Sequence, residues 1–380
     1  MHRRRTYALA LAAAALVAGT GAASPTPAPA SFVKPKATPS PSPTATPTAT
    51  QSDGTLQILT YRGYAEYGGV SPRFNWVGDF EKETGCRIAK LDTVQTAEDM
   101  IKQVGARPYD LISAGPALAG GLIAAKQVQP VDPAKVDGYD DLGERLRDLT
   151  TVSGKVYGVP YLWGYHEFVY DPARVKGELK EAFASSRTAL RDSPMTLADA
   201  ALAAGKGGDD PFALTQEQLD AAVGLLEGAK ERTYWKNPLD LVKGFATGEL
   251  DYAQATPYYR LLLQKAGLGV RTAAARETTG WADSWMLGAN VPDTTCAYRW
   301  LNWMTAPNAQ RDAAAWTGLA PANAKACKGR AREICQAYGV GDAKRLERVA
   351  FAERPPAGCR EQDGCPGYDA WAKLWDKLAK

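Results

Sequence analysis

Hydrophobic and polar positions in the chain repeat with the periods of strands and helices from residue 55 onward. Residues 55–60 alternate like a strand and run into a turn. A helix is predicted to start at Ser71, with apolar residues on one face and Gly85 as its stop signal. Residues 109–113 predict a second, buried strand, and residues 115–121 predict a glycine-rich turn. The pattern therefore predicts a strand, a helix and a strand, in that order.

Strands and helices continue to alternate further along the chain. Residues 155–160 and 161–170 predict a pair of strands with a strongly aromatic face. Thr215 and Gln218 form a capping box ahead of an apolar helical repeat. Such alternation favours parallel sheets covered by helices, so the predicted fold class is α/β. The remaining predicted elements are helices at 216–231, 239–247, 296–304 and 369–378, a strand at 250–255 and a helix from Arg260.

The first 53 residues differ in composition from the rest. Arginines from Arg3, an apolar run from Tyr7 to about Gly19 and small residues after it predict a signal peptide at 1–23. Residues 24–53 are mostly proline, threonine, alanine and serine, which predicts a disordered, extended linker. The mature protein is therefore expected in the periplasm, outside the cell or at its surface. No cysteine precedes Cys86, so the lipobox cysteine of a lipoprotein is missing.

The size and charge of the remaining chain limit the possible architectures and partners. Residues 54–380 are too many for one ordinary core and fit two lobes of about 150 residues each. The first 52 residues hold five of the 45 basic residues and none of the 42 acidic ones, so the rest has 40 basic against 42 acidic residues. This balance offers no basic face for nucleic acid or anionic lipid. The chain is expected to be a monomer that binds no nucleic acid.

The cysteines of an exported chain predict disulfides, and six of them allow 15 pairings. A zinc site is the alternative, but neither short spacing is a CxxC motif and His166 is the only histidine after the predicted signal peptide. No metal site is therefore predicted. The favoured pairs are Cys327 with Cys335 and Cys359 with Cys365, by their close spacing, and the remaining Cys86 with Cys296.

Catalytic motifs are absent from the sequence. It contains no GxSxG, HExxH or Gly-Lys-Ser/Thr pattern, and a catalytic triad could use only His166. Asp192 and Asp283 are candidates for paired acid and base groups, as in glycoside hydrolysis, although sequence does not give their distance in space. We therefore expect a protein that is not an enzyme and that needs no cofactor.

Aromatic residues stand beside isolated carboxylates at the ends of several predicted strands. Ligands of open α/β sheets bind at the carboxyl ends of strands. A carboxylate among aromatic rings suits an organic cation, because each ring attracts an ammonium by about 0.5 to 2 kcal/mol. Packing of these rings in a core or between lobes is the alternative. The residues concerned are Tyr61, Tyr64, Trp163, Asp192, Tyr258, Tyr259, Trp281 and Asp283.

Four motifs resemble the spermidine/putrescine-binding proteins of ABC importers, over about residues 54–380. They are Phe80-Glu81-Lys82-Glu83-Thr84-Gly85, Tyr109-Asp110-Leu111, Val159-Pro160-Tyr161-Leu162-Trp163-Gly164 and Trp281-Ala282-Asp283-Ser284. The resemblance implies a type II periplasmic-binding-protein fold, in which two α/β lobes, each a mostly parallel sheet flanked by helices, enclose a ligand cleft. It places lobe one at 54–160 plus 286–320, lobe two at 161–285 and a cysteine-containing C-terminal segment at 321–380. The cysteine placement also resembles that of related exported binders, which supports the favoured pairing.

The resemblance further implies the ligand and the residues that bind it. The chain would capture a polyamine such as putrescine or spermidine and deliver it to an ABC-type membrane permease. Tyr61 and Tyr64 would form aromatic walls, Trp281 a stacking plane, and Asp192 and Asp283 the amine acceptors. Several family residues are replaced: a second acid by Met195, a tryptophan by Gln254, a Ser/Tyr pair by Gly115 and Ala117, and a tyrosine by Leu319. Gln254 and Tyr258 complete the predicted ligand contacts.

Two other functions remain open at this point. Tyr258 and Tyr259 resemble the phenolate pair of ferric-ion binders of the same superfamily, and hard oxygen ligands suit a hard cation. Alternatively, the absence of a lipobox cysteine would suit a ligand-sensing accessory protein at the cell surface. Binding alone would not separate such a sensor from a transport protein.

Overall fold

The computed structural model describes residues 54–208, 210–229, 231–289, 291, 295–352 and 365–379. The predicted signal peptide and linker, at 1–23 and 24–53, lie outside the described residues. Within the described ranges, the strands form a sheet of eight, a sheet of five and a two-stranded ribbon. None of the helices in these ranges is long and apolar enough to cross a membrane.

The first sheet contains the two strands predicted near the start of the folded region. Its strands are β1 (Thr55–Tyr61), β2 (Arg87–Val94), β3 (Leu111–Ala114), β4 (Val128–Gln129), β7 (Val159–Tyr165), β13 (Thr278–Gly288), β14 (Ala320–Pro321) and β15 (Val349–Phe351). Strand β1 pairs in parallel with β2 and β3, whereas β13 pairs antiparallel with β3, β4 and β7. The sheet is therefore mixed, because β13 runs against β3 at its centre.

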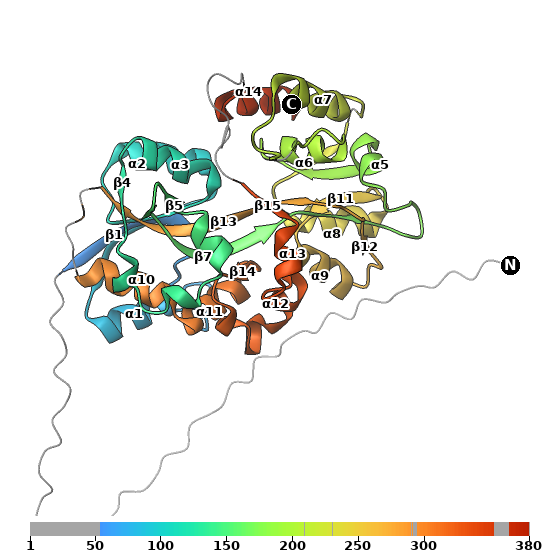
Figure 1. Ribbon diagram of the computed structural model, residues 1–380. Coiled ribbons are helices and arrows are strands. Elements are labelled where there is room, and N and C mark those ends of the chain that lie inside the picture. The colour runs from blue at the N-terminus through green and yellow to red at the C-terminus, as the bar shows by residue number, and fades with distance from the viewer. Residues whose placement is uncertain are drawn as a thin grey trace, which may run out of the picture. The chain divides into compact units, whose positions relative to one another are not determined.

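Helices cover both faces of the first sheet (Figure 1). One apolar cluster includes Phe80, Trp285 and Trp300, and the cluster on the opposite face includes Met100 and Ile112. All five side chains are buried, so the sheet separates two apolar layers. The helices are α1 (Trp76–Thr84), α10 (Thr295–Thr305) and α11 (Pro307–Thr317) on one face, and α2 (Ala97–Ala106) and α3 (Pro116–Ala124) on the other.

The second sheet is also mixed. Strand β9 pairs in parallel with β10 and β11, and β8 pairs antiparallel with β11 and β12. Apolar side chains such as Phe183 and Leu241 fill the clusters on its two faces. Its strands are β8 (Glu167–Tyr170), β9 (Thr188–Arg191), β10 (Thr233–Trp235), β11 (Tyr252–Ala255) and β12 (Arg271–Thr272). Its helices are α5 (Leu179–Ala184), α6 (Thr196–Ala203), α7 (Gln216–Glu227), α8 (Pro238–Thr247) and α9 (Pro257–Lys265).

The chain crosses between the two sheets at His166. Strand β7 belongs to the first sheet and ends at Tyr165, and β8 begins at Glu167 in the second. The His166 amide donates a hydrogen bond of 2.8 Å to the carbonyl of Thr279 in β13, so the two crossing segments are joined. The predicted pairing of 155–160 with 161–170 is therefore wrong. The aromatic segment has no turn signal between its two halves, and the chain runs through it from the first sheet into the second.

Two predicted element boundaries near the start of the chain were also wrong. Helix α1 begins at Trp76, because Asn75, not Ser71, caps it by accepting a bond from the amide of Gly78. The predicted glycine-rich turn at 115–121 is the start of α3, which follows Gly115. The stop at Gly85 is confirmed: its φ of 73° is a left-handed cap that favours glycine.

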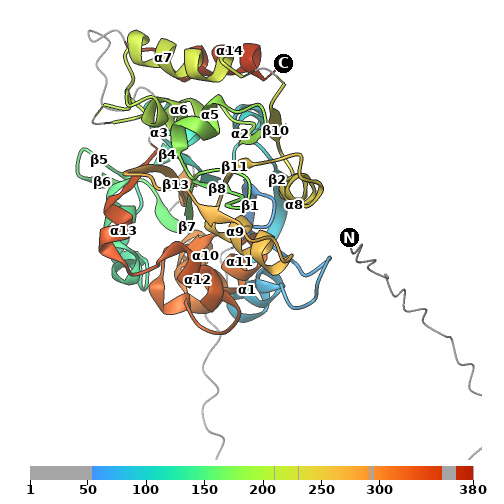
Figure 2. The ribbon, with the colours of Figure 1, turned by 90° about the vertical axis from the view of Figure 1, so that its right-hand side faces the viewer.

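The C-terminal part of the chain contacts both sheets. Strand β15, in the C-terminal segment that was predicted to pack on the lobes, joins the first sheet in parallel with β13. Helix α14 (Tyr368–Leu378) buries Trp371 and Trp375 in a cluster of the second sheet and lies beside α7 (Figure 2). The other elements are α4 (Glu144–Asp148), α12 (Arg332–Tyr338), α13 (Ala343–Glu347) and the ribbon of β5 (Thr151–Val152) and β6 (Lys155–Val156).

The disulfides agree with the predicted pairing as far as the described residues extend. Cys86 bonds Cys296 across 210 residues, where the chain leaves α1 and enters α10. Cys327 bonds Cys335, eight residues away. The predicted pair of Cys359 with Cys365 includes a residue, Cys359, that lies outside the described residues.

Candidate functional site

Asp283 is a buried carboxylate in β13, the long strand of the first sheet. The pairing of β13 with β7 shifts register between Asp283 and Ser284, which forms an irregularity at this position. The side chain is 4% exposed and accepts a hydrogen bond from the Tyr64 hydroxyl. Burial raises its pKa to about 6, against the opposing effects of the Tyr64 hydrogen bond and of Arg191. Asp283 is thus a carboxylate that gains from a cationic partner.

Tyr61, which ends β1, and Tyr64, which follows it, hold one side of Asp283. The rings of Tyr61 and Tyr64 pack edge to face with centroids 5.6 Å apart. The hydroxyl of Tyr161 and the indole of Trp76 both donate to the Tyr64 carbonyl, at 3.0 and 3.3 Å, which fixes the turn. Burial, followed by the charge of Asp283, raises the pKa of both Tyr61 and Tyr64. Both hydroxyls are therefore neutral donors near a carboxylate.

Gly115 leaves the space that the Asp283 carboxylate occupies. A Cβ at this position would lie 2.5 Å from Asp283 Oδ1 and 3.6 Å from the Tyr61 hydroxyl. The backbone of Gly115 has a φ of −84°, which any residue adopts. Glycine is therefore needed here for steric reasons, because any larger side chain would collide with the Asp283 carboxylate.

Replacing Gly115 by alanine should displace the Asp283 carboxylate and weaken ligand binding about tenfold, because a charge-assisted contact depends on its geometry. Binding calorimetry with the best ligand would measure the change. Gly105→Ala, in α2, is the matched control, since a Cβ there meets nothing within 4 Å. Equal affinity of the Gly115→Ala protein and the control would exclude a tightly packed site at Asp283.

Arg191 also lies near Asp283, and the sequence did not identify it as a site residue. It ends β9, and its guanidinium lies over the Trp281 ring, 5.2 Å from the ring centroid. It is close enough to Asp283 and Tyr61 for its charge to lower the pKa of both against the larger effect of burial. Asp283, Tyr61, Tyr64, Trp281 and Arg191 are hereafter called the Asp283 cluster. A basic residue at the carboxyl end of a strand was the signal that could have found Arg191.

Trp281 is held in place by glycine and histidine. A Cβ on Gly164, its neighbour in β7, would lie 2.6 Å from Trp281 Cζ2, so the glycine makes room for the indole. The rings of His166 and Trp281 have centroids 5.1 Å apart. Trp281 was predicted to stack on the ligand, and in the structure the Arg191 guanidinium lies over its ring.

Gln254 was predicted to contact the ligand, but it is fully buried and supports other residues. Its amide nitrogen donates to Asp199 Oδ2 at 2.7 Å, and its oxygen accepts from the backbone amide of Arg191 at 2.9 Å. Thr196 donates to the same oxygen at 3.2 Å. Gln254 therefore orders the end of β9, where Arg191 begins to turn away from the sheet.

Asp192, the second predicted amine acceptor, binds protein groups in the structure. The indole of Trp375 donates to its Oδ1 at 2.7 Å, and Lys236 Nζ lies 2.9 Å from its Oδ2. The carboxylate is thus paired with an exposed lysine and with α14, and it is not among the charges that affect Asp283. The prediction that Asp192 and Asp283 share a ligand receives no support.

Tyr258 and Tyr259 point into different parts of the molecule. Tyr258 packs against the first-sheet cluster, where its ring fills the space above Gly318, and Tyr259 packs edge to face on Trp235 in the second. Their ring centroids are 5.9 Å apart and their planes are tilted by 49°. Packing therefore accounts for both side chains, and the predicted contact of Tyr258 with a ligand has no counterpart here.

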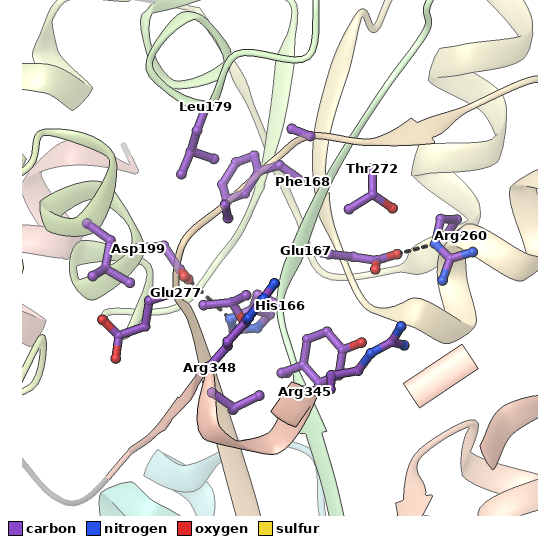
Figure 3. A pocket seen from close by; sticks show the side chains of 16 residues that line it. His166, Glu167, Phe168, Leu179, Asp199, Arg260, Thr272, Glu277, Arg345 and Arg348 are labelled. Atoms are coloured by element: carbon purple, nitrogen blue, oxygen red, sulfur yellow. Dashed lines mark hydrogen bonds and ion pairs between the residues drawn. The ribbon is translucent and has the colours of Figure 1, made fainter. Parts of the chain in front are cut away.

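A separate cavity of about 260 Å³ lies beside the crossing strands (Figure 3). Glu167 and Arg260 line it and form an ion pair of 2.6 Å, and Arg345 and Arg348 approach from the C-terminal part of the chain. None of the predicted site residues lines this cavity. It shares two lining residues, His166 and Asp199, with the hydrogen-bond chain that supports Arg191, and it is a second space large enough for a small molecule.

Comparison with known proteins gives a family and a fold. The model of the family described as bacterial extracellular solute-binding protein matches residues 75–331. A spermidine/putrescine ABC transporter substrate-binding protein from Streptococcus pneumoniae superposes with a TM-score of 0.66 at 15% identity, over 86% of this chain and 100% of that one.

Other proteins of the same fold are named for different ligands. The PBP MotA from A. tumefaciens, in complex with glucopine, gives a TM-score of 0.61 at 17% identity, over 86% of this chain and 100% of that one. The Atu4243–GABA receptor gives 0.62 at 16% identity, over 84% and 97%. These likenesses are to two-lobed type II periplasmic-binding proteins, as the sequence predicted, and at such identities they concern the fold.

Proposed function

Because the chain belongs to the bacterial extracellular solute-binding proteins, we propose that it captures a small organic solute that carries an amine and delivers it to the permease of an ABC importer. Binding takes place outside the cytoplasm, between the tyrosines at the end of β1 and the strand β13. The protein acts by reversible binding and not by catalysis. Closure of the two parts around the solute is the signal that the permease reads.

The buried Asp283 carboxylate is the observation that carries this proposal. A carboxylate 4% exposed in a strand is costly unless a positive charge compensates it. The rings of Tyr61, Tyr64 and Trp281 beside it suit an ammonium group. Since proteins of this fold are named for spermidine/putrescine, glucopine and GABA, the fold leaves the ligand open. Polyamines such as putrescine and spermidine belong to the proposed class, although the site offers one acid rather than two.

A thermal-shift screen of the full chain tests the proposal. The panel should contain diamines, polyamines, monoamines, amino acids, betaines, sugars and ferric citrate. A ligand at 100 times its dissociation constant stabilises a fold by about 2.7 kcal/mol, which is a readable shift. We expect the largest shifts among amines. Stabilisation only by sugars or iron would contradict the proposed ligand class and leave the family unaffected.

The raised pKa of Asp283 predicts how amine binding depends on pH. Only the ionised carboxylate attracts an ammonium, so affinity should rise as the pH increases through about 6 and level off above it. Burial raises the pKa of Tyr61 and Tyr64, so neither ionises in this range. The stability of the unliganded protein should change with pH in the opposite direction from the affinity. The native pKa exceeds the unfolded value of 3.8, so the free energy of unfolding should fall between about pH 4 and 6.

Calorimetric titrations and thermal unfolding over a pH series would measure both effects. The Asp283→Asn protein is the control, because it should lose the change in affinity near pH 6 and the part of the stability change that Asp283 contributes. A wild-type affinity that is constant through this range would mean that the amine does not bind Asp283.

A further inference from the structure

We infer that Arg191 is a second charged contact for the ligand, so that the solute carries a carboxylate as well as an amine. This inference rests on the proposed function and narrows its ligand from amines in general to amino carboxylates. The amine would bind Asp283, and the carboxylate would bind the Arg191 guanidinium on the Trp281 ring. Three observations about Arg191 support it.

First, Arg191 has no carboxylate partner among the described residues. Three acids beside Arg191 or its partner His166 bind other groups: Asp192 binds Lys236, Asp199 binds His166, and Glu167 binds Arg260. The side chain makes one hydrogen bond in these ranges, from Nη1 to His166 Nε2 at 3.2 Å. A guanidinium has five N–H donors, so a planar anion can be bound in bidentate fashion without displacing an existing ion pair.

Second, buried groups hold the guanidinium in place. An arginine can only donate, so His166 Nε2 accepts and the proton of the imidazole is on Nδ1. Nδ1 lies 3.2 Å from Asp199 Oδ2 and 3.0 Å from the Thr279 hydroxyl. Asp199 is in turn fixed by Gln254 and Thr279 at 2.7 and 2.8 Å. This chain of hydrogen bonds orders Arg191 before a ligand arrives, which lowers the entropic cost of binding.

Third, opposite charges stand close together in the Asp283 cluster without neutralising each other directly. Arg191 influences the pKa of Asp283, yet the two form no ion pair in the described part of the chain. A molecule with an amine and a carboxylate can satisfy both charges at once. A diamine that places one ammonium at Asp283 brings the other toward a like charge, which is unfavourable.

Pairs of ligands that differ only by one carboxylate test the inference on the full chain. Such pairs are 1,4-diaminobutane with ornithine, 1,5-diaminopentane with lysine, and agmatine with arginine, supplemented by 4-aminobutanoate. We expect the carboxylate-bearing member to bind more tightly in the pairs that bind, by about 10- to 100-fold, the usual effect of a hydrogen bond to a charged group. Calorimetry would give the affinities.

Arg191→Gln should abolish this preference and leave the diamines bound at least as tightly as before. Lys236→Gln is the matched control: it removes one positive charge next to β10, and its ion pair in the described part of the chain is with Asp192, outside the Asp283 cluster. Thermal unfolding without ligand would show that both proteins are folded, and Arg191→Lys, which keeps the charge but not the fork, should recover part of the preference.

The outcomes separate this inference from the function on which it rests. If diamines bind wild-type protein and their carboxylate-bearing counterparts bind no better, Arg191 is not a ligand contact, whereas the proposed function stands. A preference for the carboxylate that survives in Arg191→Gln also overturns the inference. If no amine of either kind binds, the proposed function fails and the inference fails with it.

Discussion

Replacing Asp283 by asparagine should weaken the binding of an amine ligand by about 2 kcal/mol or more, roughly 30-fold. The change keeps the size of the side chain and its ability to accept from Tyr64, and it removes the charge. The loss should appear in the dissociation constant measured by calorimetry at neutral pH, where the wild-type carboxylate is ionised.

The same substitution should not destabilise the unliganded protein. Because burial raises the pKa of Asp283 to about 6, ionisation opposes folding at neutral pH, and the asparagine avoids that cost. Asp192→Asn is the matched control. Its carboxylate binds Lys236 and Trp375, so the variant should retain wild-type affinity. Equal losses in the two variants would show that general charge, not the Asp283 cluster, attracts the ligand.

Removing the Cys86–Cys296 disulfide should lower the free energy of unfolding more than removing the Cys327–Cys335 disulfide. The bond closes a segment of 210 residues, and the entropic model gives about 5 kcal/mol for a loop of this length. Both sulfurs lie in the main apolar cluster of the first sheet, so replacement by alanine suits the site better than serine. Thermal or denaturant unfolding of Cys86→Ala/Cys296→Ala would measure the loss.

The disulfide of Cys327 with Cys335 provides the comparison. Its loop has a sequence separation of eight, for which the same model gives about 2.5 kcal/mol. The double alanine variant of this pair should therefore unfold at a higher temperature than that of the long pair. The reverse order would mean that local packing, and not chain entropy, dominates the contribution of these disulfides.

Much of the fold follows from local sequence signals. The capping box at Thr215 begins one helix and Gly85 ends another where the sequence predicted, because caps satisfy backbone groups within one turn. The crossing at His166 was not predicted, since no local signal marks a strand that changes sheets. Strand β15, three residues long, was missed for a related reason: it exists only through its pairing with β13.

Some residues of the candidate site also follow from local sequence signals, whereas others depend on tertiary contacts. Asp283 was identifiable because an acid between two tryptophans in a strand needs a partner, and the structure places Tyr61, Tyr64 and Trp281 near it. At the end of β9 the sequence favoured Asp192 over Arg191. Neighbouring residues of a strand point to opposite sides, so the pattern alone could not decide which of the two faces the cluster. Gln254 and Asp199 act through buried contacts that only tertiary structure brings together.

A crystal structure of the protein with the best ligand of the screen would show whether Asp283 binds the amine. We expect the ligand amine within hydrogen-bonding distance of the Asp283 carboxylate, beside the rings of Tyr61, Tyr64 and Trp281. A ligand held instead in the cavity lined by Glu167 and Arg260, without contact to Asp283, would contradict it.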